Sequence, residues 1–268
     1  MKKLGIIGIG SLGSSLLGGL LRKGVFSPKD IVIYDVQEGA SRVSATTFGV
    51  VVAPGAVELA RNAESIVIAV KPKDVTPLLE QIGPLLLPGQ NIISLAAGVR
   101  FSSMQSSLPA GVRLVRAMPN TAAAVGMSMT ALVAAPGGEV GLEVAQKLFS
   151  AIGEVVVLSE EALLDPTTAL AASGPAFLYL ILEALADGGV KAGLPRDAAR
   201  MMAAQTMKGA AQMAIQSGRH TADLKDSVTS PAGTTSAGLA VLEARGVRGA
   251  LIDAVDAASK RAKELGEK

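Results

Sequence analysis

The stretch Lys3-Leu4-Gly5-Ile6-Ile7-Gly8-Ile9-Gly10-Ser11-Leu12-Gly13 decides the fold of this chain. Residues 3–8 form a short apolar run that ends in glycine, which predicts a buried strand. From Ser11 to Lys23 leucines recur at helical spacing, which predicts a helix. Between them the pattern G-x-G-x-x-G predicts a turn that cradles a dinucleotide pyrophosphate at the helix N-terminus. The alternative is a glycine-rich turn with a purely structural role. The residues expected to bind the cofactor here are Gly8, Ile9, Gly10, Ser11, Leu12 and Gly13.

Asp35 lies about 20 residues beyond this motif, at the end of the next apolar run, 31–34. A carboxylate at this point accepts hydrogen bonds from the adenosine ribose of NAD and repels the extra phosphate of NADP. No arginine lies beside it, and the nearest, Arg42, falls a turn or two along the following helix. We therefore expect NADH or NADPH as the cofactor, with NADH favoured. A polar residue that merely closes the strand is the alternative.

Strand and helix patterns alternate through the first part of the chain and then give way to helices alone. Strands are predicted at 3–8, 31–34, 65–70, 91–95, 112–116, 127–134 and 154–158, and helices at 11–23, 56–62, 73–83 and 139–151. The later helices are predicted at 176–190, 195–217, 234–245 and 247–265. This pattern predicts an α/β chain: an N-terminal Rossmann dinucleotide-binding domain over 1–158, then an all-helical domain over 159–268. Because 176–186 is apolar nearly all round, we expect the helical domain to form a homodimer.

Composition excludes several classes of protein. The net charge is +2, basic residues form no run and aromatic residues make up 3%, so nucleic acid is not an expected partner. With no cysteine and one histidine, His220, the chain offers no thiol nucleophile, serine triad or evident metal site. The apolar stretch 168–182 looks too short to cross a membrane, and no small-residue cleavage site follows the N-terminal leucines. We therefore expect a cytoplasmic protein that does not contact membranes.

Small or polar residues follow three further strands. Because parallel strands present ligands at their carboxyl ends, these loops are expected to complete the cofactor site. Lys71 could reach a phosphate or substrate, although a solvated loop lysine fits the spacing equally well. The residues are Ala69, Val70, Lys71, Pro72, Ala96, Ala97, Gly98 and, in the loop Met118-Pro119-Asn120-Thr121, Asn120.

Two loops of the helical half carry hydroxyl groups at predicted helix starts. One is Ala172-Ser173-Gly174-Pro175-Ala176-Phe177, and the other is Ser230-Pro231-Ala232-Gly233-Thr234-Thr235. The free N–H groups and the dipole at a helix N-terminus would bind a carboxylate. Simple N-capping by Ser or Thr is the alternative for the second loop.

Together these motifs resemble the pyrroline-5-carboxylate reductase family. The likeness also includes Ala186-Asp187-Gly188-Gly189-Val190 and Leu224-Lys225-Asp226, and it covers nearly all the chain. The resemblance implies an NAD(P)H-dependent oxidoreductase that reduces the cyclic imine 1-pyrroline-5-carboxylate to L-proline, the last step of proline biosynthesis. It also implies interlocked homodimers that often assemble into decamers.

The resemblance further implies roles for individual residues. The backbone amides of Thr234 and Thr235 would hold the substrate carboxylate, and the Thr235 hydroxyl would act catalytically at the ring nitrogen. The residues implied to bind substrate are Glu161, Ser173, Ser230, Gly233, Thr234 and Thr235. The chain departs from the family pattern at Phe177, where Tyr is usual, and at Ala232, where Gly is usual.

Two other functions are also compatible with these motifs. One is another imine or keto-acid reductase on the same scaffold, although the helix 176–190 lacks the lysine that hydroxyacid dehydrogenases carry. The other is a non-catalytic NAD(P)-binding redox sensor.

Overall fold

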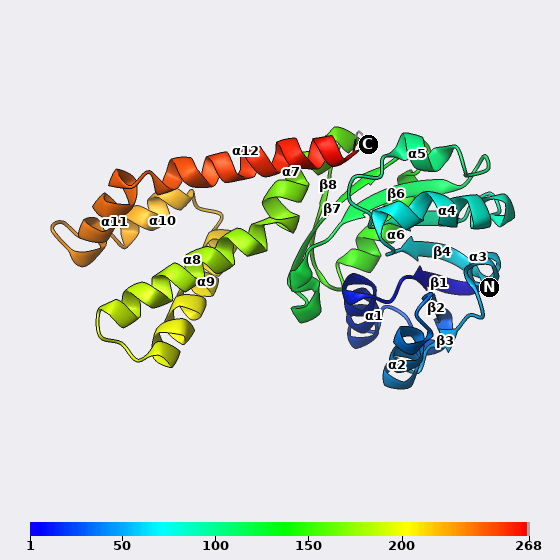
Figure 1. The fold of residues 1–268 in the computed structure, drawn as a ribbon, viewed down its shortest axis with the longest axis horizontal. Helices are drawn as coiled ribbons and strands as arrows, with labels where there is room; N and C mark the ends of the chain where they lie inside the picture. The colour runs from blue at the N-terminus through cyan, green and yellow to red at the C-terminus, as the bar shows by residue number, and fades with distance from the viewer. Residues whose placement is uncertain (267–268) are drawn as a thin grey trace. The chain divides into compact units, whose positions relative to one another are not determined.

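The computed structural model describes residues 1–266, which form two compact units (Figure 1). The first unit holds residues 1–173 and the chain from 257 onward, and the second holds residues 174–256. The division therefore falls later than the predicted boundary between 158 and 159, and it returns the end of the last helix to the first unit. Residues 267 and 268 of the predicted helical domain lie outside the described residues.

An eight-stranded sheet forms the centre of the first unit. Its order is β3-β2-β1-β4-β5-β6-β7-β8. All neighbours are parallel except β6 and β7, which are antiparallel. The first six strands have the order of a doubly wound dinucleotide-binding fold, so the predicted Rossmann domain is confirmed. The strands are β1 (Lys2–Ile7), β2 (Ile31–Tyr34), β3 (Val51–Val52), β4 (Ala63–Ile68), β5 (Asn91–Ser94), β6 (Arg113–Met118), β7 (Ser128–Ala134) and β8 (Gly153–Val157).

Helices cover both faces of this sheet. The leucines of α1 (Ser11–Arg22) and the apolar face of α6 (Glu139–Phe149) pack on one side. The helices α3 (Ala56–Asn62), α4 (Pro72–Ile82) and α5 (Phe101–Gln105) pack on the other. The central strands are therefore buried on both faces, which explains why they read as continuous apolar runs in the sequence. The unit also contains α2 (Glu38–Phe48), α7 (Leu164–Thr167), the 3₁₀ turns 28–30, 83–85, 121–125 and 161–163, and a π-helix at 168–172.

The second unit is helical, as predicted. It contains α8 (Gly174–Lys191), α9 (Arg196–Ser217), α10 (Thr221–Ser227), α11 (Thr234–Ala244) and the first part of α12 (Val247–Gly266). Gly193 and Gly218 end α8 and α9 in left-handed conformations, with φ of 101° and 61°. The hairpin of α8 and α9 is close-packed, since a Cβ at Gly189 would lie 3.2 Å from the Ala199 Cβ.

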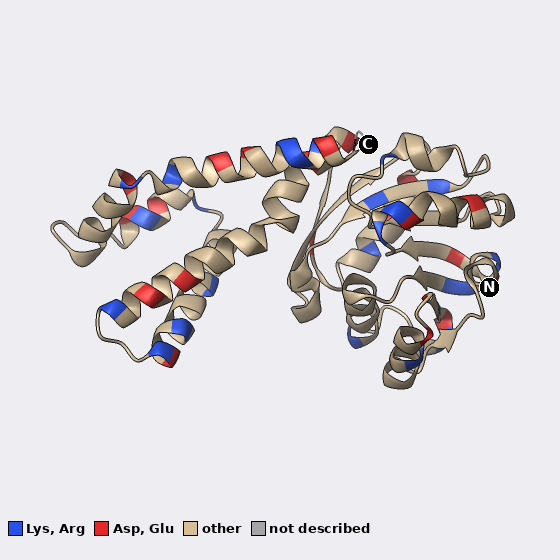
Figure 2. Ribbon diagram, in the orientation of Figure 1, with Lys and Arg blue, Asp and Glu red and all other residues tan. Residues whose placement is uncertain are grey.

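The helices of the second unit expose large apolar side chains. Met201 is 75% exposed, Ile215 72% and Leu180 68%. Acidic and basic residues do not gather into one charged surface but alternate along the chain, as along α12 in Figure 2. Large apolar side chains are also exposed in the first unit, but they are more closely spaced along the helices of the second, as is typical of a protein interaction site.

The helical stretch Glu161–Lys191 is longer than the sequence suggested. By length and composition it could cross a membrane, since its most apolar 18 residues have a mean hydropathy of 1.6 and only 17% of them are buried. The prediction that this apolar stretch is too short was therefore wrong. The reason is that Gly174 and Pro175 occupy the first turn of α8, where proline is tolerated, so helical turns precede them directly. A helix that packs against another protein chain passes the same test.

Candidate active site

The glycine motif forms a tight turn between β1 and α1, and each glycine has a separate reason. Gly8 has a φ of 97°, and a Cβ there would lie 2.6 Å from the Ala69 carbonyl oxygen. A Cβ at Gly13 would lie 2.0 Å from the Gly8 carbonyl oxygen. Gly10 differs, because no atom lies within 4 Å of the place its Cβ would take. The fold itself therefore requires Gly8 and Gly13, whereas Gly10 leaves space in front of the α1 N-terminus for a ligand.

The predicted cofactor loops meet at one edge of the sheet. The Ala69 N–H donates to the Ile7 carbonyl (2.8 Å), and the Leu95 N–H donates to the Ile68 carbonyl (2.9 Å). These bonds place residues 69–72 and 96–98 beside the glycine turn, at the carboxyl ends of β4 and β5. Strand order reverses between β1 and β4, which is where such sheets bind nucleotides. The glycine turn and these two loops therefore form one continuous candidate site.

Asp35 is held in a fixed orientation at the end of β2. Its Oδ2 accepts the Ile9 N–H (2.7 Å), and its Oδ1 accepts the Gln37 N–H (2.8 Å). The carboxylate lines a cavity of about 370 Å³, together with Glu38, Ser41 and Arg42. Ser41 is 2% exposed and its Oγ has no hydrogen-bond partner. Sequence reasoning missed Ser41, since nothing in the pattern distinguishes it from any helical serine.

These features fit a nicotinamide dinucleotide. An uncapped helix N-terminus and an open Gly10 suit the pyrophosphate. An oriented carboxylate and an unpartnered buried hydroxyl suit the adenosine ribose. Among residues 1–266, no group of three or more His, Cys, Asp or Glu side chains could hold a metal ion.

Two predicted cofactor residues differ in how freely their side chains can reach a ligand. Both ends of the Asn120 amide are hydrogen-bonded within the protein. Its Oδ1 accepts the Ala122 N–H (3.1 Å), and its Nδ2 donates to the Ala171 carbonyl (3.0 Å). It therefore supports the loop after β6, and the amide offered for cofactor binding is already engaged. Lys71 is exposed at the N-cap of α4, and its side chain has no hydrogen-bond or ion-pair partner among those described.

The second predicted site lies at the start of α11, in the second unit. Gly233 is the N-cap, and no side chain caps the helix. The first intrahelical bond runs from the Ala237 N–H to the Gly233 carbonyl (3.2 Å), so the N–H groups of Thr234 and Thr235 precede it. A Cβ at Gly233 would lie 2.2 Å from the Ser230 Oγ, which explains the glycine. The alternative of N-capping by Ser or Thr is thus wrong for α11, and its N-terminus is available to an anion.

Glu161 and Ser173 belong to the first unit. Glu161 Oε1 accepts both the Phe101 N–H (2.6 Å) and a bond from Arg116 Nη1 (2.8 Å). Arg116 is 3% exposed, and burial lowers the pKa of its guanidinium although Glu161 opposes that effect. Sequence reasoning missed Arg116, because a charged residue inside a strand pattern indicates only exposure. Ser173 directly follows the π-helix, a distortion that is frequent at functional sites.

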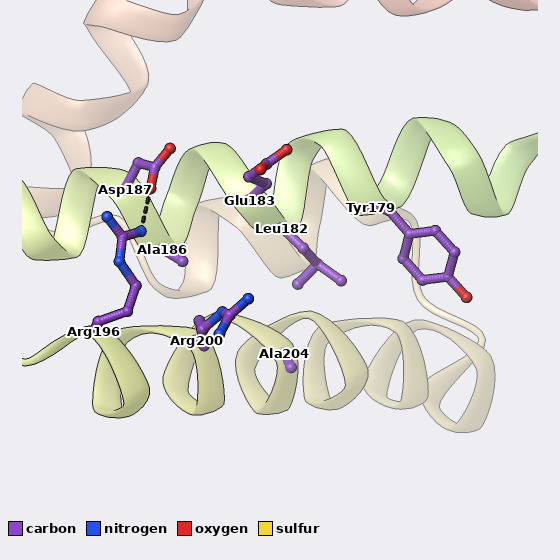
Figure 3. Close-up of a pocket in the computed structure, with 8 residues that line it drawn as sticks. All are labelled: Tyr179, Leu182, Glu183, Ala186, Asp187, Arg196, Arg200 and Ala204. Carbon is purple, nitrogen blue, oxygen red and sulfur yellow. Dashed lines mark hydrogen bonds and ion pairs between the residues drawn. The ribbon is translucent and has the colours of Figure 1, made fainter.

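A further cavity lies between α8 and α9 (Figure 3). This cavity measures about 790 Å³ and is an open groove. Arg196 reaches across it from α9 to form an ion pair with Asp187 of α8. None of the predicted site residues lines the groove. His220 is the exposed N-cap of α10, where its Nδ1 accepts the Ala222 N–H.

Comparison with known proteins agrees with this geometry. Residues 161–265 match the family profile described as pyrroline-5-carboxylate reductase dimerisation, and residues 3–98 match that of NADP oxidoreductase coenzyme F420-dependent. The pyrroline-5-carboxylate reductase of Methanosarcina acetivorans is 40% identical over 270 residues, which span 100% of this chain and 99% of that protein. The chain belongs to the pyrroline-5-carboxylate reductase family. The enzyme of Glycine max is 43% identical over 264 residues, covering 98% of this chain and 95% of that protein.

Solved structures of the family share the whole architecture. A pyrroline-5-carboxylate reductase from Coxiella burnetii aligns with a TM-score of 0.94 and 32% identity, covering 100% of this chain and 99% of that one. The Plasmodium falciparum enzyme, solved with NADP bound, aligns with a TM-score of 0.86 and 29% identity over 98% of both chains. The predicted family and the predicted two-part fold are therefore confirmed.

Proposed function

We propose that this chain reduces the C=N bond of 1-pyrroline-5-carboxylate to give L-proline, the final step of proline biosynthesis, with NADH or NADPH as the reductant. The observation that carries this function is similarity over the whole chain. The 40% identity to the Methanosarcina acetivorans reductase spans both the nucleotide-binding part and the helical part. The chain is thus an oxidoreductase of the pyrroline-5-carboxylate reductase family.

The reaction needs little acid–base chemistry from the protein. When bound, the reduced nicotinamide supplies a hydride to the imine carbon, and the ring nitrogen takes or keeps one proton, which gives the saturated amine. A protonated imine is already electrophilic at carbon, so orientation accounts for much of the rate enhancement. This agrees with a candidate site whose assigned residues include no histidine and whose one lysine, Lys71, lies in a cofactor loop.

The start of α11 is the proposed site for the substrate carboxylate. The N–H groups of Thr234 and Thr235 are free of side-chain caps, and the helix dipole favours a negative charge there. The Thr235 hydroxyl donates to, and helps protonate, the ring nitrogen. Ser230 and Gly233 shape the loop through their close packing. Glu161 and Ser173 are proposed to lie at the substrate as well, with Glu161 already bonded to Arg116.

The cofactor is proposed to bind along the carboxyl edge of the sheet. Residues 8–13 hold the pyrophosphate, and residues 69–72 and 96–98 border the nicotinamide. Asp35 favours NADH because its oriented carboxylate accepts ribose hydroxyl groups. Asn120 contributes by supporting the loop after β6.

The active protein is proposed to be a cytoplasmic homodimer. Its exposed apolar helices, and the match of residues 161–265 to a dimerisation family, favour contact through the C-terminal half. The same contact accounts for the apolar stretch Glu161–Lys191 without a membrane. Assembly of dimers into a decamer is the larger state that the family resemblance implies.

The direct test follows reduced-cofactor absorbance while purified protein is given 1-pyrroline-5-carboxylate. We expect turnover with both cofactors and a higher kcat/KM with NADH. Thr235→Ala should lower kcat by about a hundredfold, whereas Thr235→Ser keeps the hydroxyl and most of the activity. No turnover with either cofactor would overturn the proposed function. Equal activity of the Ala and Ser variants would show that the Thr235 hydroxyl has no catalytic role.

A further inference from the structure

We propose that Glu38 is a specificity-determining residue, which acts with Asp35 to weaken binding of the 2′-phosphate of NADPH. It does so by holding the guanidinium of Arg42 and by adding a second negative charge to the same cavity. The inference rests on the proposed use of a nicotinamide dinucleotide and concerns which of the two cofactors this chain accepts. It assigns a role to a pair of residues, Glu38 and Arg42, that the reaction itself does not use.

The cavity beyond β2 contains polar groups that suit the two adjacent hydroxyls of a ribose. Asp35 accepts one backbone N–H at each of its oxygens, so its carboxylate cannot rotate away from the cavity it lines. Ser41 adds a hydroxyl that is 2% exposed and has no partner. A buried hydroxyl without a hydrogen bond is unfavourable, and a ribose hydroxyl in this cavity would satisfy it. One acceptor and one free hydroxyl are the groups that two adjacent ribose hydroxyls require.

The same cavity contains one side chain with the charge to bind a phosphate. Of the described residues lining it, Arg42 alone carries a positive charge. Its Nη2 donates to Glu38 Oε2 across 2.7 Å, one turn earlier on α2. Both side chains are exposed, so this pair adds little to folding stability. The pair matters for the charge of the cavity, because the guanidinium of Arg42 is already bonded to the carboxylate of Glu38.

The balance of charge therefore opposes NADPH. Asp35 and Glu38 present two negative charges against the one of Arg42, whereas a 2′-phosphate brings up to two more. In water-like surroundings, each unit charge at about 6 Å changes an affinity by roughly threefold. Removing the Glu38 charge and releasing Arg42 act in the same direction, so the expected gain for a 2′-phosphate is roughly three- to tenfold. A 2′-hydroxyl carries no charge and should be nearly indifferent to the change.

The test uses cofactor fragments, so it does not depend on catalysis. Isothermal titration calorimetry on the full chain would measure 2′,5′-ADP, which carries the extra phosphate, and 5′-AMP, which lacks it. Glu38→Gln should raise the affinity for 2′,5′-ADP roughly three- to tenfold and change that for 5′-AMP less than twofold. Adding Arg42→Ala to this variant should abolish the gain. Arg42→Ala alone should leave 5′-AMP binding unchanged.

Glu64→Gln is the matched control, because it makes the same charge change at the opposite end of the sheet, near the start of β4. The proposal is overturned if Glu38→Gln gains no more than this control, or if the gain survives the loss of Arg42. It is also overturned if the wild-type chain binds neither fragment. That last result leaves the reductase assignment to its own turnover assay, so the two failures remain distinguishable.

Discussion

Arg116 and Glu161 form a partly buried ion pair that is bonded to the end of the Gly98 loop. Arg116 Nη1 donates to Glu161 Oε1 across 2.8 Å, with side-chain exposures of 4% and 21%. The same oxygen accepts the Phe101 N–H, at the end of the loop that contains Gly98. Arg100, in that loop, bonds Asp165 (3.3 Å) in turn. The pair therefore connects β6, the Gly98 loop and the segment before α7.

We expect Glu161→Ala to lower the free energy of unfolding by about 3 kcal/mol, because it leaves the Arg116 guanidinium buried without a counter-charge. Glu161→Gln keeps an oxygen that both donors can reach, so its loss should be smaller. Chemical denaturation would measure both, beside the KM for 1-pyrroline-5-carboxylate. If Glu161 mainly binds substrate, the opposite pattern appears: KM rises in both variants while stability hardly changes.

The two glycines of the cofactor turn should respond differently to the same substitution. Gly13→Ala places a Cβ 2.0 Å from the Gly8 carbonyl oxygen, and we expect a loss of about 3 kcal/mol of stability. Gly10→Ala meets no protein atom within 4 Å, so its melting temperature should match the wild type. Its cofactor affinity should nevertheless fall at least about tenfold, since the new methyl group blocks the pyrophosphate from the α1 amides. Thermal melts with NADH titrations would separate the effects, and normal binding by Gly10→Ala would contradict the proposed site.

Elements with a clear apolar pattern could be predicted from the sequence, whereas several short elements without one could not. The strand at 31–34 and the helix at 56–62 have the predicted bounds. The five residues of α5, the seven of α10 and the two of β3 were not predicted. These three elements contain too few apolar residues at a regular spacing to be distinguished from loops.

The candidate site divides in the same way. The glycine motif carries its own local geometry, so residues 8–13 could be predicted as a unit. The Arg116–Glu161 pair, by contrast, joins residues 45 positions apart and exists only once the sheet has formed. The commitment of Asn120 to the Ala171 carbonyl is likewise a tertiary contact. Residue types indicate which groups can bond, but the fold decides which of them are left for a ligand.

Ala232 offers a test in which one substitution has opposite signs at two places. Its φ of 55° is the only positive value among the described residues other than glycine. A left-handed alanine costs about 1 kcal/mol, so Ala232→Gly should stabilise the chain by up to that amount. Ala240→Gly, inside α11, should destabilise it by about 1 kcal/mol, because glycine is a poor helix former. Denaturation at equal protein concentration would measure both, and a destabilised Ala232→Gly would show that the loop relieves its strain otherwise.

The apolar surface of the second unit should control assembly. Met201 is 75% exposed on α9, and a charge there should be tolerated by a lone chain but not within an apolar subunit contact. We therefore expect Met201→Glu to shift the protein toward the mass of a single chain in light scattering coupled to size exclusion. Val140→Glu, on α6 of the first unit and 49% exposed, is the matched control and should leave the oligomer intact. If Met201→Glu keeps the wild-type mass while remaining folded, the contact between subunits does not include this face of α9.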